Sequence, residues 1–391
     1  MNILFLNHNV VWQSTFNRCF LFARELVILG HQVTIMTNAP RARLRFWTYS
    51  KHGVIIIESP DLFWGSLRTG WDPVNVVRRC FVLRHLSFDC IHAFDTRPTV
   101  ILPALYYKMF MRRIPLIIDW ADWWGHGGAI SLRKHKFLTW LFAPIETFFE
   151  EYFRRFADAT TVTSMLLAQR AVKLGLHRRS VTILYSGADI RAVKGLQKQA
   201  LRKKLSLPSD AHIIIFPAYV QYDLPMVLQT FEAVIHRDTR AILVLTGKVL
   251  QTSLVSYGRL LQSGKIILAE NLTREMLFQY LVAADVGLLP LANNIANAAR
   301  FPIKFGDFLA AGLPCITNNV GDVGMLVKKY NIGLLTRYDH DDMARNISKL
   351  LKQPNRLFQL HKRILLFAQK KFSWQIFAYQ LFIMYRRVCR R

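Results

Sequence analysis

Acidic residues are scarce in this chain. Of its 391 residues only 25 are Asp or Glu, against 52 Lys and Arg, so the formal net charge is +27. Such an imbalance attracts an acidic partner, which can be nucleic acid, a phosphorylated small molecule or an anionic membrane surface. The shortage is most pronounced at positions 343–391, where Asp and Glu are absent and 12 Lys and Arg occur.

Cysteine, glycine and proline are also few. The five cysteines are dispersed, without a Cys-x-x-Cys pair, which excludes a disulfide-stapled secreted domain and favours reduced thiols in the cytosol. With 19 glycines, 14 prolines and 52% apolar residues, the composition excludes a collagen, a low-complexity chain and a disordered one. We therefore expect a folded protein of two or three domains.

Long hydrophobic runs are missing as well. The best candidates, 100–111 and 137–149, are about a dozen residues long and contain Lys108 or Glu146. They fall short of the ~20 residues that a membrane-spanning helix needs. The apolar start at 1–6 stops at Asn7, which predicts no signal peptide. The sequence thus predicts a chain that can lie on a membrane without crossing it.

Short β-rich runs alternate with helical patterns along the chain. The first series of predicted strands is 2–6, 32–37, 54–57, 90–92, 116–119, 159–162 and 181–184, with helices predicted at 15–29, 74–86, 98–111 and 132–156. The second series of predicted strands is 213–217, 241–246, 266–268, 286–290, 315–317 and 332–335. This alternation predicts an α/β fold of two doubly wound, Rossmann-like domains, each with a parallel sheet covered on both faces. We expect domains at 1–186 and 187–373, with a last helix at 374–391 that packs back on the first.

Residues directly after the strands are the candidates for chemistry, because ligands of open α/β sheets bind beyond the carboxyl ends of strands. In the segment 301–317, Pro302 suits a helix start, and Lys304 lies in the first turn, where the helix dipole disfavours a cation unless an anion is bound. Asp307, one turn later, could accept hydrogen bonds from ribose hydroxyls. The alternative is a packing helix with a Lys304–Asp307 surface pair.

A second candidate segment, 119–128, is rich in aromatic, acidic and glycine residues. It carries the potential ligand contacts Asp119, Asp122, Trp123 and His126, together with three glycines. Aromatic faces pack on sugar rings, and carboxylates hydrogen-bond hydroxyls or take a proton. The glycines allow close backbone approach. The alternative is a buried aromatic cluster with capping aspartates.

The loop 7–15 follows the first predicted strand and contains His8, Ser14 and Thr15. It lacks the glycines of a dinucleotide fingerprint, which argues against NAD and FAD. Ser14 and Thr15 are natural helix caps, and they can also point at a phosphate. Asp95 and Arg97, after another strand, either face a ligand or form a local ion pair.

Metal binding is not indicated. The acids around His340 at 338–343 precede apolar residues at helical spacing, so an acid-rich helix start explains them better than a metal site. There is no Asp-x-Asp after a strand and no His/Cys ligand spacing. We expect a metal-independent protein.

The segment from Asn297 to Pro314 resembles the nucleotide-sugar motif of the family 4 retaining glycosyltransferases, group 1, which have the GT-B architecture of two Rossmann-like domains facing a cleft. Three further stretches, at 5–34, 157–189 and 283–290, resemble the same family in the same order. The resemblance implies transfer of a sugar from a nucleoside diphosphate sugar, the donor substrate, with no further cofactor. It also implies that the second domain holds most of the donor.

The resemblance assigns roles to individual residues. Asp307 matches the family's ribose contact, and Pro302, Asn297, Ser14 and Thr15 are the other expected donor contacts. Ala299 stands where the family has a sugar-binding glutamate, so Asn297 or Arg300 would replace it. The cations that the family often has after the first strand of the second domain are missing at 218–223, so Lys304 and Arg300 would neutralise the leaving diphosphate. Asp122 is the expected catalytic contact of the first domain, with His126 as its rival and Asp119, Trp123 and His8 as acceptor or sugar contacts.

The remaining charge favours a membrane surface. Basic residues alternate with aromatic ones at 41–47 and 133–137, which suits an anionic interface, although a solvated basic face is the alternative. No nucleic-acid-binding module is recognisable, so we expect no nucleic-acid partner. We expect a cytoplasmic enzyme at the inner face of a membrane, acting on a lipid-linked or cell-surface glycan acceptor. The alternatives are a sugar-nucleotide epimerase, which needs no acceptor, and a non-catalytic membrane- or glycan-binding relative.

Overall fold

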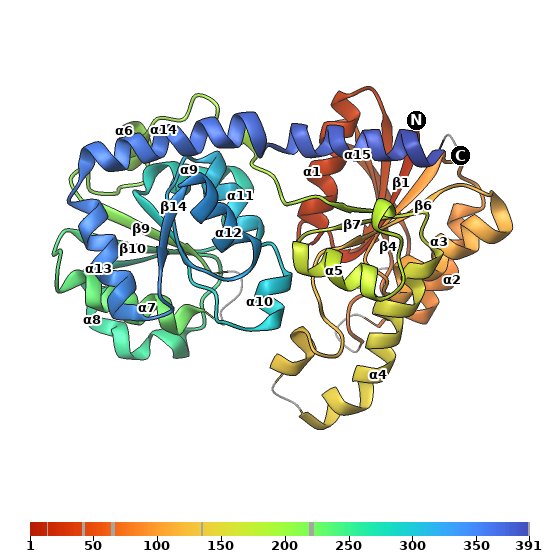
Figure 1. Cartoon of the computed structure of the whole chain (residues 1–391), viewed down its shortest axis with the longest axis horizontal. Coiled ribbons are helices and arrows are strands. Elements are labelled where there is room, and N and C mark those ends of the chain that lie inside the picture. Colours follow the sequence, from red (N-terminus) through yellow and green to blue (C-terminus); the bar gives the residue numbers. More distant parts are fainter. Residues whose placement is uncertain (14, 41–43, 64–66, 134–135, 219–222, 390–391) are drawn as a thin grey trace. The chain divides into compact units, whose positions relative to one another are not determined.

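The computed structural model describes the chain except for residues 14, 41–43, 64–66, 134–135, 219–222 and 390–391 (Figure 1). The chain forms two compact units. The first unit comprises Met1–Tyr185, Ala299–Phe301 and Trp374–Arg391, and the second comprises Ser186–Ala298 and Pro302–Ser373. The observed division after Tyr185 lies one residue from the predicted one after 186. The three residues Ala299–Phe301 belong to the first unit, which the sequence did not indicate.

The first unit is built on an eight-stranded sheet in the order β3-β4-β2-β1-β5-β6-β7-β8. Its strands are β1 (Asn2–Val10), β2 (Gln32–Asn38), β3 (Trp47–Lys51), β4 (Val54–Ser59), β5 (Cys90–Phe94), β6 (Leu116–Trp120), β7 (Ala159–Val162) and β8 (Val181–Ile183). In the central register Phe5 lies opposite Ile35 on one side and His92 on the other. The central strands are rich in Val, Ile and Leu and almost wholly buried, as strands covered on both faces must be.

Strand β3 departs from the predicted parallel sheet, because it pairs antiparallel with β4. The two strands are joined at His52 and Gly53, whose φ angles of 51° and 76° are both positive. Two successive positive φ values are typical of the tight turns that connect antiparallel strands. Strand β3 was not predicted from the sequence, although Trp47 and Tyr49 are strand formers.

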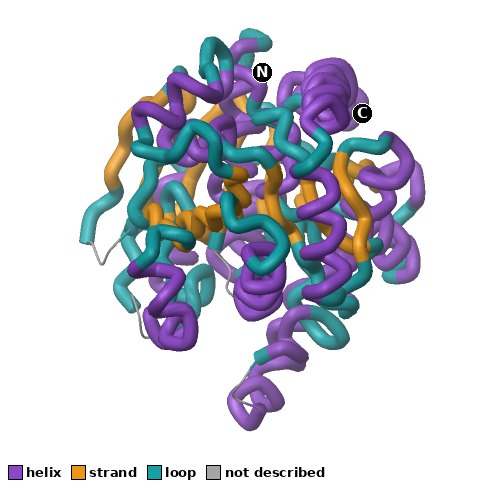
Figure 2. Tube along the Cα trace, turned by 90° about the vertical axis from the view of Figure 1, so that its left-hand side faces the viewer, coloured by secondary structure: helices purple, strands orange, loops and turns teal. Residues whose placement is uncertain are grey.

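Helices cover both faces of this sheet (Figures 1 and 2). They are α1 (Thr15–Ile28), α2 (Pro73–Leu83), α3 (Pro98–Tyr106), α4 (Lys136–Tyr152), α5 (Met165–Lys173) and α15 (Trp374–Cys389), with the short helices η1 (Tyr107–Met111), η2 (Ala129–Leu132), η3 (Phe153–Phe156) and η4 (Arg178–Ser180). Helix α15 packs on the first unit, where Trp374 meets the ring of Phe22 edge-on and the Tyr385 hydroxyl hydrogen-bonds His92 Nδ1 at 2.6 Å. The predicted helices at 98–111 and 132–156 each end in a short helix of different pitch.

The second unit has a six-stranded parallel sheet in the order β11-β10-β9-β12-β13-β14. Its strands are β9 (His212–Pro217), β10 (Ala241–Thr246), β11 (Ile266–Ala269), β12 (Val286–Leu289), β13 (Cys315–Asn318) and β14 (Gly333–Thr336). Its helices are η5 (Ile190–Val193), α6 (Lys198–Lys204), α7 (Leu224–Ile235), η6 (Gln251–Tyr257), α8 (Gly258–Gln262), α9 (Arg274–Ala283), α10 (Ile295–Ala299), α11 (Ile303–Ala310), α12 (Gly321–Tyr330), α13 (His340–Leu351) and α14 (Pro354–Lys371). Both units are therefore doubly wound α/β domains, as predicted.

The strand order places the candidate residues. In the first unit, the chain proceeds from β1 to β2 on one side and to β5 on the other, so the order reverses at β1. In the second unit it reverses in the same way at β9, between β10 and β12. Ligands of such sheets bind beyond the carboxyl ends of strands at this switch point. No helix in the described part of the chain is long and apolar enough to cross a bilayer.

Candidate functional site

The loop 121–128, which follows β6, is held from one side by Glu150 of α4. One carboxylate oxygen of Glu150 accepts hydrogen bonds from Trp120 Nε1 at 3.0 Å and from the Trp124 backbone N–H at 2.9 Å. The other oxygen accepts from the Gly125 N–H at 2.6 Å. Burial raises the pKa of Glu150 to about 7, although Arg154 and these donors act in the opposite direction. Glu150 is fully buried, so its role is to fix the loop.

Two glycines of this loop allow close packing of the chain on itself. A Cβ at Gly125 would collide with the Glu150 carboxylate, and a Cβ at Gly128 would collide with the Trp123 carbonyl. Close backbone approach was predicted at these glycines. The close approach is to the protein's own groups, which makes the loop compact and well defined.

The predicted contacts of this loop occupy different environments. Trp123 is half-buried, its Nε1 donates to the His126 carbonyl at 2.9 Å, and the Arg170 guanidinium lies 3.6 Å from its ring centroid. His126 is exposed, and its backbone N–H donates to Thr147 Oγ1 at 2.9 Å. The ring of Trp123 is therefore already covered on one face by an arginine, whereas the His126 side chain faces solvent.

Asp122 and Arg300 both belong to the first unit. Asp122 is exposed to solvent. The pKa of its carboxyl group is nevertheless raised by the surrounding protein, while the positive charge of Arg300 acts to lower it. Two residues that are 178 positions apart, both predicted to be catalytic, are thus brought near one another.

Asp119 is a buried structural anion at the end of β6. It forms a two-pronged ion pair with Arg18 of α1, at 3.1 Å and 3.0 Å, and accepts a hydrogen bond from Thr161 at 2.5 Å. Burial alone would raise the pKa of Asp119, but Arg18 and the other neighbours outweigh it, and the pKa is lowered. With the carboxylate 1% exposed, Asp119 joins α1 to the sheet; its predicted contact with acceptor or sugar stays a prediction.

His8, Asp95 and Arg97 form a buried cluster at the carboxyl ends of β1 and β5. His8 Nδ1 lies 3.4 Å from Asp95, and Arg97 Nε lies 3.5 Å from the same carboxylate oxygen. Burial, assisted by Arg97, lowers the pKa of His8 to about 3, so its imidazole is neutral at physiological pH. Asp95 has a φ of 96°, a region that non-glycine residues rarely adopt and that often marks functional sites.

Trp124 connects this cluster to the loop 121–128. Its Nε1 donates to Asp95 Oδ1 at 3.2 Å, and the Arg97 guanidinium lies 5.4 Å from its ring centroid. The local Asp95–Arg97 pair that the sequence left open is therefore present, and it belongs to a larger network. This network lines the carboxyl ends of β1, β5 and β6, where a ligand of the first unit would bind.

In the second unit, α11 begins as the sequence predicts. Pro302 is the N-cap and Lys304 lies in the first turn. The Lys304 Nζ is 4.6 Å from the ring centroid of Phe216, at the end of β9, so a cation–π contact holds this cation near the switch-point strand. The helix start and Lys304 together present positive potential on this side of the sheet.

Asp307, one turn into α11, is buried and paired with Arg274 of α9. Arg274 donates to Asp307 Oδ1 at 2.7 Å, and burial raises the pKa of Asp307 although Arg274 acts to lower it. Gly306 beside it lets the Ser186 and Gly187 carbonyls approach the helix, because a Cβ there would lie 2.5 Å from the nearer one. The predicted ribose contact of Asp307 stays a prediction, and the alternative of a surface pair does not fit a buried carboxylate.

The remaining predicted donor contacts are local. Asn297 donates its side-chain amide to the Ala292 carbonyl at 2.8 Å and so braces the loop before α10. Thr15 is the first residue of α1, and Ser14 lies outside the described residues. No group of three potential metal ligands occurs in the described ranges. Asp339, from the acidic cluster, caps α13 by accepting the Asp342 N–H at 2.8 Å.

The residues that hold the site were not predicted from the sequence. Glu146, Glu150 and Arg154 recur every four residues on an otherwise apolar helical stretch, and this charged stripe was a usable signal. Arg274 gave no such signal, because its partner Asp307 is 33 positions away.

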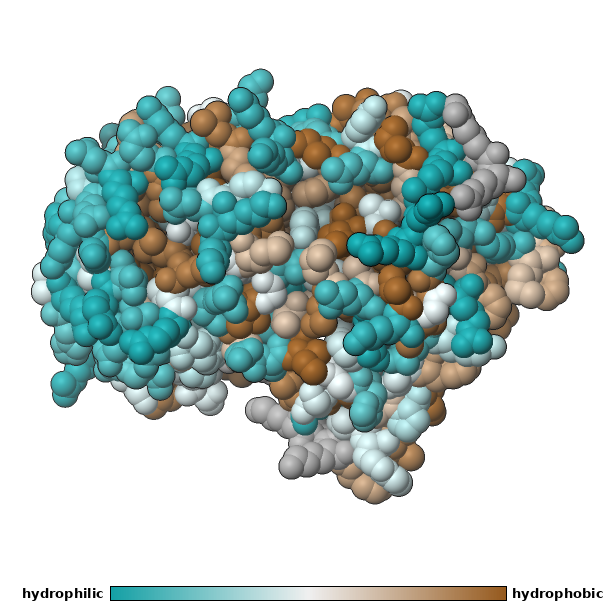
Figure 3. Space-filling model, viewed as in Figure 1, coloured by the Kyte–Doolittle hydropathy of each residue, from teal (hydrophilic) through white to brown (hydrophobic). Residues whose placement is uncertain are grey.

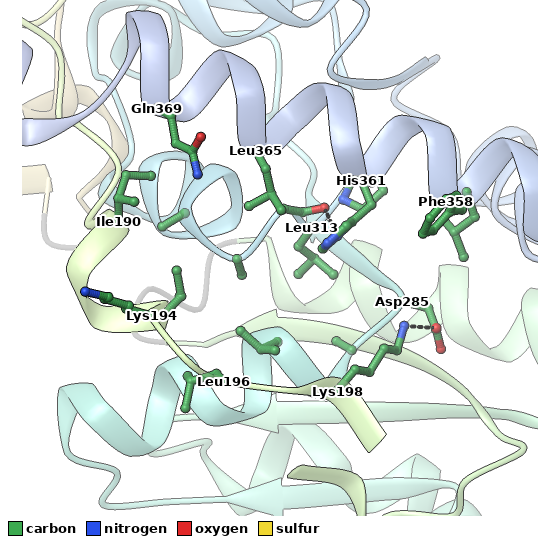
Figure 4. Close-up of a pocket in the computed structure, with 18 of the residues that line it drawn as sticks. Ile190, Lys194, Leu196, Lys198, Asp285, Leu313, Phe358, His361, Leu365 and Gln369 are labelled. Atoms are coloured by element: carbon green, nitrogen blue, oxygen red, sulfur yellow. Dashed lines mark hydrogen bonds and ion pairs between the residues drawn. The ribbon is translucent and has the colours of Figure 1, made fainter. Parts of the chain in front are cut away.

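The second unit also contains a cavity of about 730 Å³ between α14 and the segment 190–198 (Figure 4). Its walls are mainly apolar, and its polar contacts include a Lys198–Asp285 ion pair at 2.5 Å and a hydrogen bond of 2.9 Å between His361 and the Gly312 carbonyl. Asp285 directly precedes β12, and Pro314 precedes β13. The cavity therefore lies at the amino ends of the strands, at the opposite edge of the sheet from the start of α11.

Two family models match the chain in sequence order. Glycosyltransferase Family 4 matches residues 17–192, and Glycosyl transferases group 1 matches residues 211–353. The second match contains α11 with Lys304 and Asp307, and the first contains the loop 121–128. No curated protein sequence matches the chain.

Solved structures share the fold over nearly the whole chain. Sucrose-phosphate synthase from Thermosynechococcus elongatus has a TM-score of 0.76 at 17% identity, covering 99% of this chain and 98% of that one. HepE from Anabaena, in complex with UDP-glucose, has a TM-score of 0.70 at 15% identity and covers 99% and 100%. WaaG, a glycosyltransferase involved in lipopolysaccharide biosynthesis, has a TM-score of 0.70 at 13% identity and covers 98% and 99%. This likeness confirms the predicted GT-B fold of two Rossmann-like domains.

Proposed function

This chain belongs to the family 4, group 1 glycosyltransferases, and from that membership we propose that it moves a sugar, with retention at the anomeric carbon, from a nucleoside diphosphate sugar to a lipid-linked or cell-surface glycan. That it is a glycosyltransferase using a nucleotide sugar follows from the two family matches. The observation that carries the finer proposal is the arrangement at α11. There, a helix start, Lys304 and the buried Asp307–Arg274 pair stand together beside the switch-point strand.

On the donor side, the demand of the reaction is to stabilise the leaving diphosphate. Lys304 is held at Phe216 in the first turn of α11, so its charge and the backbone N–H groups of the helix start would act on the same phosphate. Asp307, oriented by Arg274, would accept hydrogen bonds from the ribose hydroxyls. Arg300 is the second cation proposed for the phosphates, and Pro302 and Asn297 shape the backbone around them.

On the acceptor side, Asp122 is the proposed contact for the reacting sugar or the acceptor hydroxyl. Its raised pKa and its neighbour Arg300 suit a carboxylate that accepts a hydrogen bond without a fixed protein partner. Deprotonation of the acceptor would occur late and could use the leaving phosphate itself. The exposed His126 is the rival contact from the same loop, which Glu150 and Thr147 keep in place.

The neighbours suggest which donor to test first. HepE has been solved with UDP, UDP-glucose, and UDP together with glucose. We therefore propose UDP-glucose as the first donor, ahead of other nucleoside diphosphate sugars. Binding to the native state raises the melting temperature by mass action, and ~100 Kd of ligand adds roughly 2.7 kcal/mol. A thermal-shift screen in which no nucleoside diphosphate or its sugar raises the melting temperature would contradict the proposal.

We also propose that the enzyme works in the cytoplasm, at the inner face of a membrane. The support is the distribution of charge, because 12 Lys and Arg and no acid occur at 343–391, and Arg112, Arg113 and Arg155 are exposed on the first unit. Each cation near an anionic bilayer contributes about 1 kcal/mol to binding. A lipid-linked acceptor would be found there.

Ala299 offers a further test of how far the family's chemistry applies. It is fully buried and packs with Trp120, Val162 and Leu167 of the first unit, at the position where the family has a glutamate. Ala299→Glu would bury a carboxylate among apolar side chains, so we expect the free energy of unfolding to fall by at least about 2 kcal/mol, without a gain in transfer. Urea unfolding measures the loss. Ala296→Glu, on the same short helix at a half-buried position, is the control and should cost much less.

One result for Ala299→Glu would contradict this expectation. If Ala299→Glu keeps the parent's stability and increases transfer, the glutamate reaches the sugar, and the buried position described above is not the one used in catalysis.

A further inference from the structure

Helix α4 exposes an unusual number of large apolar side chains. Phe137 and Trp140 are each 72% exposed, and the other apolar side chains exposed on this helix are Leu141, Phe142, Ile145, Phe148 and Tyr152. The helix extends away from the sheet of the first unit (Figures 1 and 2), and brown apolar atoms are visible over it in Figure 3. Exposed apolar area of this kind on a folded protein marks a contact surface.

The exposed residues follow the helical period. Phe137, Leu141, Ile145, Phe148 and Tyr152 are separated by three or four residues, so they form one stripe along α4. Trp140 lies three residues after Phe137 and directly before Leu141, and we call these six residues together the outer stripe.

The opposite face of α4 carries polar groups that bind other parts of the first unit. Glu146 pairs with Arg68 at 2.7 Å and with Arg133 at 2.5 Å, and Glu150 accepts the backbone N–H groups of the loop 121–128. Thr147 Oγ1 accepts the His126 N–H at 2.9 Å. The two faces of α4 therefore differ. One face is apolar and exposed, and the other holds the loop that contains Asp122.

The charge around α4 favours binding to an anionic lipid surface over binding to a second copy of this chain. Arg68 and Arg133 share the single carboxylate of Glu146, Arg170 pairs with Glu151, and Arg155 stacks on the Tyr152 ring at 4.0 Å, so these four arginines outnumber the two carboxylates. A second copy of this chain would bring these cations against identical cations, within a molecule of net charge +27, which is unfavourable. Anionic lipid headgroups would complement them, and Trp and Tyr favour the boundary between headgroups and acyl chains.

We propose that α4 is an interfacial helix, which inserts its outer stripe into an anionic bilayer and thereby places the loop 121–128 at the membrane surface. The helix lies in the plane of the interface, with Phe137, Trp140 and Leu141 among the acyl chains and the flanking arginines at the headgroups. Because Glu150 and Thr147 of α4 accept hydrogen bonds from the loop, the position of the helix also fixes the position of the loop. Insertion of α4 is the first half of this proposal, and placement of the loop 121–128 at the membrane is the second half. The second half rests on the proposed function, because placing the loop there matters for catalysis only if Asp122 contacts a lipid-linked acceptor.

Vesicle co-sedimentation tests the insertion without requiring any enzymatic activity. The probe is a vesicle of phosphatidylglycerol and phosphatidylcholine in equal parts, with pure phosphatidylcholine as the neutral comparison. We expect the double variant Phe137→Ser/Trp140→Ser to bind the anionic vesicles at least about 10-fold more weakly than the parent. The control is Val255→Ser, because Val255 is an apolar residue 77% exposed on η6 of the second unit, outside the basic segment 343–391, and this variant should bind as the parent does.

Several outcomes would overturn the proposal. Parent-like vesicle binding by the double variant would show that α4 does not insert, and equal parent binding to both kinds of vesicle would remove the role of charge. A parent dimer in gel filtration that the double variant dissociates would show that a second copy covers the stripe. Both substituted residues are exposed, so we expect the double variant to stay folded. A thermal unfolding curve like that of the parent would show this.

The second half of the proposal has its own readout. Transfer to a lipid-linked acceptor in vesicles should fall in the double variant, while transfer to a water-soluble acceptor analogue should stay at the parent's rate. Equal loss with both acceptors would show that α4 acts on catalysis and not on membrane placement. Failure of the proposed function itself appears differently, as an absence of transfer by the parent while vesicle binding persists.

Discussion

Replacing Lys304 with alanine is expected to reduce sugar transfer by about 10²–10³-fold, the usual effect of removing one group that stabilises developing charge in a transition state. Negative charge builds on the leaving diphosphate as the glycosidic bond breaks. Lys304 lies in the first turn of α11, with its Nζ 4.6 Å from the centroid of the Phe216 ring, so its charge already stands beside the switch-point strand. The loss should appear mainly in kcat, because the interaction strengthens in the transition state.

The controls for Lys304→Ala separate chemistry from folding. Lys304 is half-buried, and its cation–π contact is worth roughly 1 kcal/mol, so the variant should stay folded. Lys304→Arg keeps the charge and should retain part of the activity, while Lys203→Ala, at an exposed position on α6, should retain all of it. Near-normal transfer by Lys304→Ala would show that the diphosphate is held elsewhere.

Replacing Arg18 with methionine is expected to lower the free energy of unfolding at pH 7 by about 3–5 kcal/mol, the usual cost of leaving one partner of a buried ion pair alone. Both side chains of the Arg18–Asp119 pair are almost fully buried, and Arg18 also donates to the Leu184 carbonyl at 2.8 Å. Because folding lowers the pKa of Asp119, the pair's contribution is present above the ordinary value of 3.8 and is lost as the pH falls through the lowered one. Urea unfolding at pH 7 measures the effect.

The double variant Arg18→Met/Asp119→Leu is the matched comparison. It removes both charges together, so it should be clearly more stable than Arg18→Met alone, despite losing the Thr161 hydrogen bond. A single variant that loses less than about 1 kcal/mol would show that Asp119 can take a proton or rehydrate without cost, contrary to its described surroundings.

Much of the fold was predictable because the strands are short, apolar and fully buried. Runs such as Ala159–Val162 and Ala241–Thr246 are too short to form buried helices, so they were predicted as strands. The structure has strands with these same bounds. Strand β3 was missed because it is an exposed edge strand without an apolar run. Its signals were the strand formers Trp47 and Tyr49 and the turn at His52 and Gly53.

The site was less predictable, since its supports come from distant positions. The helix start with Pro302 and Lys304 could be predicted, because it depends on neighbouring residues. The pairing of Asp307 with Arg274 and the packing of Ala299 with Trp120 could not be predicted, because each contact joins segments far apart in the sequence. Asp122 and Arg300 belong to separate sequence motifs, and their proximity is visible only in three dimensions.

The stereochemistry of the transferred sugar tests the central claim most directly. The enzyme would be incubated with the donor identified by thermal shift and an acceptor analogue, and proton NMR would follow the anomeric signal of the product from the first turnover. Our account predicts acceptor-dependent transfer with the anomeric configuration of the donor retained. An inverted product, or a rearranged donor sugar formed without any acceptor, would contradict it.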